Sequence, residues 1–230
     1  MSLRLTRRVF LTDLGKTGLA VAVLGVACSE PAAEGGDPWR RVDLGSVSAY
    51  VIARNGEAVV VDTGVAGSAG SIETAVGGLG LTWSDVGYVA LTHAHPDHVG
   101  SLAEVLEAAP EATGYVGAGD ADAVTSPRPL STVGDGDQVM GLQVIETPGH
   151  TPGHLSFLDS ELDLLLAGDA LVGADGGVAG PDPRFSDDMA VAVGSVAKLA
   201  ELSFDTVVFG HGKPVEGNAS ARVGDLVDTG

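Results

Sequence analysis

The chain has 230 residues and a formal net charge of −19, from 12 basic and 31 acidic residues. This length fits one domain with a sizeable buried core, and the charge excludes electrostatic binding to nucleic acid or to an anionic membrane. The single cysteine, Cys28, excludes a disulfide within the chain.

Residues 1–28 have the pattern of an export signal. Arg7 and Arg8 precede an uncharged apolar stretch, residues 17–27, which is too short to span a bilayer comfortably as a helix. The Arg-Arg pair resembles a twin-arginine signal, although a chance pair before an apolar run looks the same. Residues 24–28 resemble an imperfect lipoprotein box, with cleavage by an ordinary peptidase nearby as the alternative. We expect an exported protein, in the cell envelope or outside the cell, with a lipid anchor if Cys28 is acylated.

Residues 29–38 are small, polar and proline-containing, which predicts a flexible tether over 29–41 before a domain at 42–230. A β-hairpin follows, with strands predicted at 46–53 and 58–61 around an Asn-Gly turn. The second strand leads into Asp62, for which two roles stay open. Its carboxylate would support a metal-binding loop from outside, or cap the loop that follows, and both can hold at once.

A helical spacing covers residues 68–79, and an apolar run at 86–91 predicts a further strand. The run leads directly into the segment Leu-Thr-His-Ala-His-Pro-Asp-His-Val-Gly at 91–100. A helix is predicted at 98–109, which would place its positive end near this segment.

Four side chains of this segment are metal-ligand types: His93, His95, Asp97 and His98. His93 and His95 are two residues apart, so they point to the same side of an extended backbone. Pro96 then bends the path, and the next two residues can face elsewhere. Imidazole and carboxylate are the usual ligands of zinc and other divalent first-row metals, so the cluster can serve two neighbouring ions. The alternative is a set of loop polar groups that cap the next helix.

The rest of the chain alternates short strands with loops. We expect strands at 113–116, 139–146, 155–158, 162–167 and 206–209, and a helix at 186–202. Residues 118–130 are expected to be irregular, and a short tail to close the chain. The Gly/Pro/Asp-rich segment 171–187 is interpreted as either a loop over the active site or a solvated connector. By pattern alone, these elements support only a mixed α/β fold.

The motifs together resemble the metal-binding signature of the metallo-β-lactamase-fold superfamily. The resemblance is carried by Thr-His-Ala-His-Pro-Asp-His-Val-Gly, then Thr-Pro-Gly-His-Thr-Pro-Gly-His at 147–154, Gly-Asp at 168–169 and Gly-His-Gly at 210–212. It implies an αββα four-layer sandwich and two divalent metal ions, Zn²⁺ first, with iron or manganese as alternatives. The ligands it implies are His93, His95 and His150 for one ion, Asp97, His98 and His211 for the other, and Asp169 as the bridge.

The chemistry implied is hydrolysis of an ester, thioester or lactone in a small-molecule substrate. Two divalent ions about 3.5–4 Å apart can share a hydroxide, which attacks the carbonyl without a side-chain nucleophile. The sequence agrees, because Cys28 lies in the leader and no Gly-x-Ser-x-Gly motif occurs. Asp97 is also a candidate proton acceptor. His154 is expected to be a structural or outer residue rather than a ligand.

Asp169 and the run around His150 most resemble glyoxalase II (hydroxyacylglutathione hydrolase). The chain ends soon after His211, so the glutathione-binding domain of that enzyme is expected to be missing, and the substrate is not carried over. Three alternatives remain open. They are a β-lactam hydrolase, an iron-dependent oxidoreductase of the sulfur dioxygenase type, and a metal-binding lipoprotein without catalytic activity.

Overall fold

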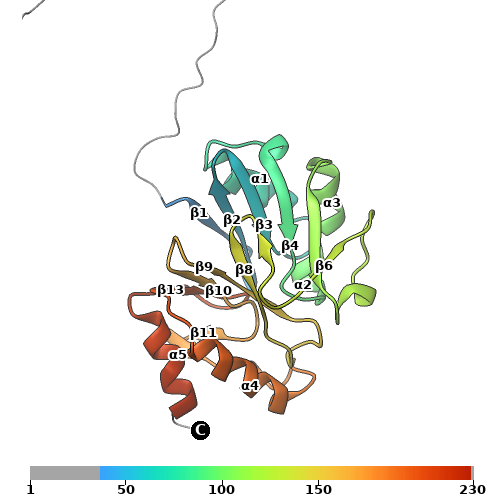
Figure 1. Cartoon of the computed structure of the whole chain (residues 1–230). Helices are drawn as coiled ribbons and strands as arrows, with labels where there is room; N and C mark the ends of the chain where they lie inside the picture. The colour runs from blue at the N-terminus through green and yellow to red at the C-terminus, as the bar shows by residue number, and fades with distance from the viewer. Residues whose placement is uncertain (1–36, 229–230) are drawn as a thin grey trace, which may run out of the picture. The chain divides into compact units, whose positions relative to one another are not determined.

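Two six-stranded sheets face each other in the computed structural model, which describes residues 37–228 (Figure 1). The first sheet has the order β1 (Trp39–Asp43), β2 (Ser48–Arg54), β3 (Glu57–Val61), β4 (Val86–Ala90), β5 (Thr113–Gly117) and β6 (Ser131–Val133). The second has the order β14 (Val215–Glu216), β13 (Thr206–Val208), β10 (Leu164–Leu166), β9 (Leu155–Asp159), β8 (Leu142–Glu146) and β7 (Gln138–Val139). A separate antiparallel pair consists of β11 (Val172–Ala174) and β12 (Gly177–Ala179).

Helices cover the outer face of each sheet. The first sheet packs against α1 (Ala69–Gly77) and α3 (Leu102–Ala108), and the second against α4 (Met189–Ala200) and α5 (Ala219–Asp228) (Figure 1). The remaining turns are α2 (Pro96–Val99), η1 (Trp83–Asp85) and η2 (Ala121–Ala123). The αββα sandwich expected from the motifs is therefore confirmed.

Three apolar layers hold the four structural layers together, and single strands contribute to two of them. In β3, Ala58 and Val60 pack toward α1 and α3, whereas Val59 and Val61 pack between the sheets. In β10, Leu165 faces α4 and α5 while its two neighbours face the first sheet. Strands buried on both faces are expected to be continuously apolar, which is why they lack polar alternation in the sequence.

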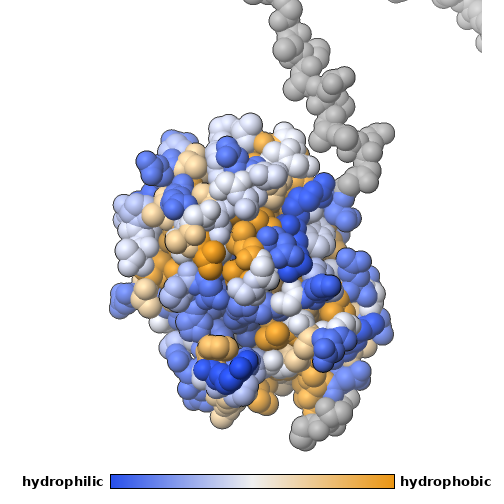
Figure 2. All heavy atoms as spheres, turned by 180° about the vertical axis from the view of Figure 1, so that it is seen from behind, coloured by the Kyte–Doolittle hydropathy of each residue, from blue (hydrophilic) through white to orange (hydrophobic). Residues whose placement is uncertain are grey.

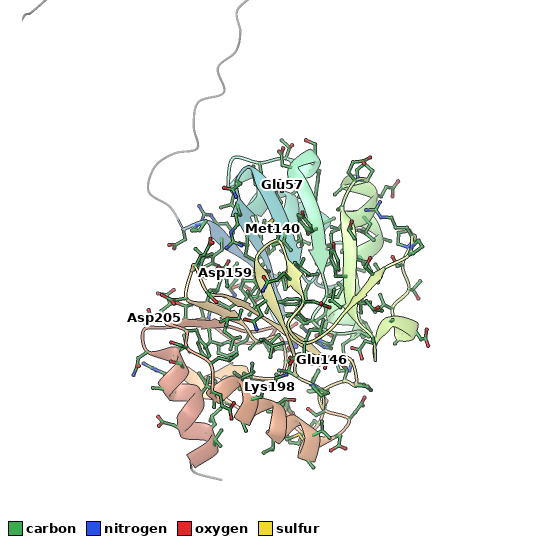
Figure 3. The ribbon with its side chains drawn as sticks, in the orientation of Figure 1. Glu57, Met140, Glu146, Asp159, Lys198 and Asp205 are labelled. Atoms are coloured by element: carbon green, nitrogen blue, oxygen red, sulfur yellow. The ribbon has the colours of Figure 1, made fainter. Side chains whose placement is uncertain are left out.

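Local chemistry explains two of the junctions. The hairpin between β2 and β3 turns at Asn55 and Gly56, both at positive φ (55° and 84°), as the Asn-Gly pair predicts. Helix α4 begins at Asp188, whose carboxylate accepts from the backbone N–H groups of Ala190 and Val191. Near its other end, Lys198 Nζ donates to the carbonyl of Glu146 at the end of β8, 2.9 Å away (Figure 3).

The predicted helix at 98–109 is wrong as a single element, because the structure divides it into α2 and α3. The division lies at Gly100, where the chain passes close to the loop after β3. A Cβ at Gly100 would lie 2.5 Å from the backbone nitrogen of Ala66, so the approach requires glycine. The separation gives α2 its own direction, independent of the helix that packs on the sheet.

Other expectations need correction at the level of single elements. The tether predicted to reach residue 41 is shorter, because β1 begins at Trp39. The predicted tail contains β14 and α5, and the segment 171–187 contains the β11–β12 hairpin. β6 follows the irregular segment and was not predicted. Apart from β1, which has five residues, each missed strand is two or three residues long, too short for a periodic signal.

The predicted signal at 1–28, the acylation of Cys28 and the tether up to residue 36 lie outside the described residues and stay predictions. Within residues 37–228, no helix has the length and apolar character needed to cross a membrane. On the face shown in Figure 2, hydrophilic side chains form a band across the middle, with hydrophobic patches on either side.

Candidate metal centre

The polar residues of the site follow the carboxyl ends of strands. Five of them follow strands that pair in parallel: Asp62 after β3, His93 after β4, Asp120 after β5, Asp169 after β10 and His211 after β13. In sheets with parallel strands, ligands bind at this edge, where loops project from a rigid scaffold. The structure therefore brings to one place residues that are more than a hundred positions apart.

Pro96 determines the shape of the histidine-rich loop. It occupies the first position of α2, and His95 before it is extended, with φ −64° and ψ 145°. His93 and His95 consequently lie on extended backbone, while Asp97 and His98 lie on the first helical turn. The loop thus directs its four candidate ligands in two directions, as the sequence suggested.

The first group of ring nitrogens converges around His95. Its Nδ1 lies 3.0 Å from His93 Nε2 and 3.0 Å from His150 Nε2. Three imidazoles from two loops thereby present nitrogen atoms to a common point, with mutual separations within 4.8 Å. Three nitrogen donors at such separations match one face of a tetrahedral metal site.

The second group contains Asp97, His98 and His211. Asp97 Oδ2 lies 3.3 Å from His211 Nε2 and 3.9 Å from His98 Nε2. Asp169 spans the two groups. Its Oδ2 lies 3.4 Å from His150 Nε2 and 3.3 Å from His211 Nε2, and its Oδ1 lies 3.5 Å from His98 Nε2.

Two buried atoms of the site test whether a cation fits. Within residues 37–228, His98 Nε2 and Asp169 Oδ1 are the buried side-chain polar atoms that have no hydrogen-bond partner. Leaving a buried polar atom unpaired costs about 1–3 kcal/mol, so native proteins rarely retain one without a reason. Both atoms face each other inside a set of nitrogen and oxygen donors, and a divalent cation would satisfy them. The residues present therefore fit a metal.

Four of the imidazoles present Nε2 to the site, and their other ring nitrogen, Nδ1, contacts a polar group of the protein. His93 Nδ1 contacts Thr92 Oγ1 at 3.0 Å, and His98 Nδ1 contacts Asp62 Oδ2 at 2.7 Å. The other two contacts are His150 Nδ1 with Ser186 Oγ at 3.3 Å and His211 Nδ1 with the carbonyl of Ser46 at 2.5 Å. Such contacts select the tautomer that keeps Nε2 free and are typical of histidines that ligate metals.

Asp62 supports the histidine-rich loop from outside, which is the first of the two roles left open by the sequence. Besides contacting His98, its carboxylate accepts from the backbone N–H and the hydroxyl of Thr92, both at 2.7 Å. It therefore orients an imidazole of the site and closes the loop that carries the histidines. Its backbone has a positive φ of 59°, which is uncommon outside glycine and aims the side chain back toward the site.

Both ring nitrogens of His154 are hydrogen-bonded within the protein. Its Nε2 accepts from the backbone N–H of Asp169 at 2.9 Å, so Nδ1 carries the proton and donates to Thr147 Oγ1 at 2.8 Å. Burial lowers the pKa of His154 to about 3 and keeps the ring neutral. The side chain acts by positioning Asp169, in agreement with the expectation that it is not a ligand.

The carboxylates and imidazoles of the site shift one another's pKa values. Hydrogen bonds with Asp169 and Asp97 raise the pKa of His211 to about 11, and the bond with His211 lowers the pKa of Asp97 to about 2. Burial opposes protonation of His98, but the Asp62 and Asp169 carboxylates still raise its pKa. Carboxylates that favour the charged form of an imidazole would also favour a bound cation at the same place.

Asp120 was missed by the sequence analysis, although it connects two loops of the site. Its Oδ2 accepts from the N–H of Ala94 at 2.9 Å and from Thr151 Oγ1 at 2.7 Å, and its Oδ1 accepts from the N–H of Gly153 at 2.7 Å. The loop with His93 and the loop with His150 are thereby joined. The available signal was an aspartate just past a strand end, after Gly117-Ala118-Gly119.

Close packing at the end of β13 leaves no space for a side chain. A Cβ at Gly210 would lie 2.0 Å from Asp169 Oδ1 and 2.5 Å from His98 Cε1. Glycine at this position allows the loop with His211 to approach the other ligands. The Gly-His-Gly motif is therefore explained by space as well as by its histidine.

Two cavities open onto the site. One, of about 290 Å³, is lined by His95, Pro96, Asp97, Asp169, Phe185 and His211. The other, of about 230 Å³, is lined by His150, Asp169, Val172, Asp182, Arg184, Phe185 and His211. Residues 171–187 therefore contribute to the walls, which supports the interpretation of this segment as a loop over the site.

Comparisons with known proteins agree with this geometry. The family model described as the metallo-β-lactamase superfamily matches residues 42–211. The uncharacterised protein YobT of Bacillus subtilis (strain 168) is 30% identical over 73% of this chain and 83% of its own length. A hydroxyacylglutathione hydrolase of Xylella fastidiosa (strain M12) is 34% identical over 70% of this chain, which spans 57% of that protein. The crystal structure of TTHA1623 in a di-iron-bound form superimposes with a TM-score of 0.61 at 27% identity, over 77% of this chain and 93% of that one.

Proposed function

The chain belongs to the metallo-β-lactamase superfamily, and from this premise we propose that it is a hydrolase that uses two divalent cations to cleave an ester, thioester or lactone. The observation that carries the proposal is the position of Asp169 between two groups of ligand-type side chains. A carboxylate shared in this way offsets the repulsion between two neighbouring cations.

The residues divide into two sets in this proposal. His93, His95 and His150 would hold one cation, Asp97, His98 and His211 the other, and Asp169 would contact both. Cations in such a site lower the pKa of water toward neutrality and polarise a carbonyl oxygen. Zinc is the first candidate because of the nitrogen-rich donor set, and the di-iron form of TTHA1623 makes iron the main alternative.

The side chains supply the remaining steps. His98 and His211 are oriented by Asp62 and by the carbonyl of Ser46, and Asp169 is positioned by His154. Asp97 lines the larger cavity, and 36% of its side chain is exposed. Its carboxylate is therefore placed to accept a proton from water and to return it to the departing alcohol or thiol.

The test combines metal analysis with a substrate panel on the full chain. We expect about two cations per chain, and hydrolysis of at least one of a linear ester, a thioester and a lactone. Asp169→Ala should lose at least one cation and about a hundredfold or more of kcat/KM, because it removes the shared ligand. Asp122→Ala, which removes an exposed carboxylate outside the site, is the matched control.

Three results would contradict the proposal. The first is full activity in Asp169→Ala, which would exclude the shared-ligand arrangement. The second is rapid turnover of a β-lactam with no hydrolysis of the other substrates. The third is a single iron per chain together with oxygen consumption, which would favour the oxidoreductase.

A further inference from the structure

Among residues 37–228, Phe185 is the most exposed large apolar side chain, with 61% of its surface accessible. It lies in the segment that joins β12 to α4, beside the metal centre. Single exposed apolar residues are common on protein surfaces, so exposure alone carries no conclusion. The structure adds two observations: the turn that carries the ring is held in place, and the ring lines the cavities of the site.

The turn that carries Phe185 is closed by its own hydrogen bonds. The carbonyl of Asp182 accepts from the N–H of Phe185 at 3.1 Å and from Ser186 Oγ at 2.8 Å. The carboxylate of Asp182 accepts from the N–H and Nε of Arg184, at 2.9 and 3.0 Å. The guanidinium of Arg184 lies over the Phe185 ring, 5.3 Å from its centre.

The same turn is attached to a loop of the metal centre. The N–H of Asp187 donates to the carbonyl of His150 at 3.1 Å, and the N–H of Asp188 donates to that of Gly149 at 2.9 Å. Ser186 Oγ contacts His150 Nδ1 at 3.3 Å, on the side of the ring away from the other ligands. The backbone position of Phe185 is therefore coupled to the position of a candidate ligand, and the turn places the ring beside the site.

Phe185 lies where the two cavities meet. Both cavities are lined by Phe185, Asp169 and His211, so the ring stands at their junction over the centre. The larger cavity continues along Pro96, and the smaller one continues past Asp182 and Arg184. Because Asp182 pairs with Arg184, the guanidinium offers no unbalanced charge with which to select an anion. The two arms share the Phe185 ring, and each adds one further apolar residue, Pro96 in the larger arm and Val172 in the smaller one.

We propose that Phe185 is a specificity residue that packs against an apolar acyl group of the substrate, in the arm it forms with Pro96. The substrate class is then a linear ester or thioester with an apolar acyl chain, whose leaving group lies in the smaller arm, beside the Asp182–Arg184 ion pair. A compact lactone would fill only the junction. This inference rests on the proposed hydrolase function, and it names the substrate that the function leaves open. An aromatic ring on a hydrogen-bonded turn binds an apolar group at low entropic cost, because the backbone needs no further ordering and the ring has few rotatable bonds.

The test uses metal-loaded full-length protein and two esters with the same leaving group, 4-nitrophenyl acetate and 4-nitrophenyl hexanoate. The wild type should prefer the hexanoate. Phe185→Ala should reduce the hexanoate-to-acetate ratio of kcat/KM about tenfold, mainly through KM, because the acyl chain loses its apolar contact area. Phe185→Leu should retain most of the preference. Val193→Ala, which truncates an exposed side chain of α4, should leave the ratio unchanged.

The outcomes separate this inference from the function on which it rests. If neither ester is hydrolysed in a metal-dependent way, and a thioester and a lactone are also stable, the proposed function fails. If hydrolysis occurs but Phe185→Ala keeps the wild-type ratio at wild-type metal content, the role of Phe185 is refuted. Equal loss on both esters also refutes it, because contact with the acyl chain predicts a selective loss.

Discussion

Removing the carboxylate of Asp120 should weaken both the fold and the metal centre. The residue is 2% exposed and accepts three hydrogen bonds from the two histidine-bearing loops. A hydrogen bond to a charged acceptor contributes roughly 1.5–3 kcal/mol, and neighbouring bonds are not additive. We therefore expect Asp120→Ala to cost about 4 kcal/mol and to lower Tm by about 10 °C.

The same substitution should reduce cation affinity, although Asp120 contacts no candidate ligand side chain. Loss of a residue that orients ligand loops typically costs 10- to 100-fold in metal affinity. Asp120→Asn should retain only part of the stability, because its amide group would face N–H donors of the loops. Asp122→Ala is the control for charge removal two positions away. The assays are thermal unfolding with and without a chelator, and competition for zinc with a chromophoric chelator. Wild-type values of both Tm and zinc affinity in Asp120→Ala would refute the reasoning.

Two further predictions concern buried groups. For His154, the unfolded ring takes up a proton below its usual pKa of 6.5, while the folded ring stays neutral down to about 3, so stability falls as pH falls between these values. In chelator-treated protein, acidification from pH 7 to 5 should therefore lower the free energy of unfolding of the wild type by about 2 kcal/mol more than that of His154→Gln. Denaturant titrations at each pH measure this difference. The same pH dependence in both proteins would contradict a neutral buried ring. Arg54 donates to both oxygens of Asp159, which is fully buried, so Arg54→Leu should cost about 3–5 kcal/mol by leaving that carboxylate without its cationic partner. Adding Asp159→Asn should recover part of the loss, and no recovery in urea unfolding would show that another contact of Arg54 dominates.

The pattern of the chain by itself determined a large part of the architecture. Apolar runs predicted most of the strands that carry the site, because strands buried on both faces need continuous apolar sequence. The Asn55-Gly56 pair predicted its hairpin, because both positions require a positive φ. The candidate ligands were also visible, since four of them lie within six residues and the others follow glycine near strand ends.

Tertiary structure alone decided how these groups act. The role of His154 depends on its hydrogen bonds with Thr147 and Asp169. The role of Asp120 depends on Ala94 and on a loop more than thirty residues away. Motifs mark some of these residues, but no pattern in the sequence shows which of them pair. The division between α2 and α3 depends on a close backbone approach, and the position of Phe185 on hydrogen bonds to the His150 loop. Local sequence encodes backbone preference and burial, whereas hydrogen bonds between distant segments exist only after the two sheets have packed.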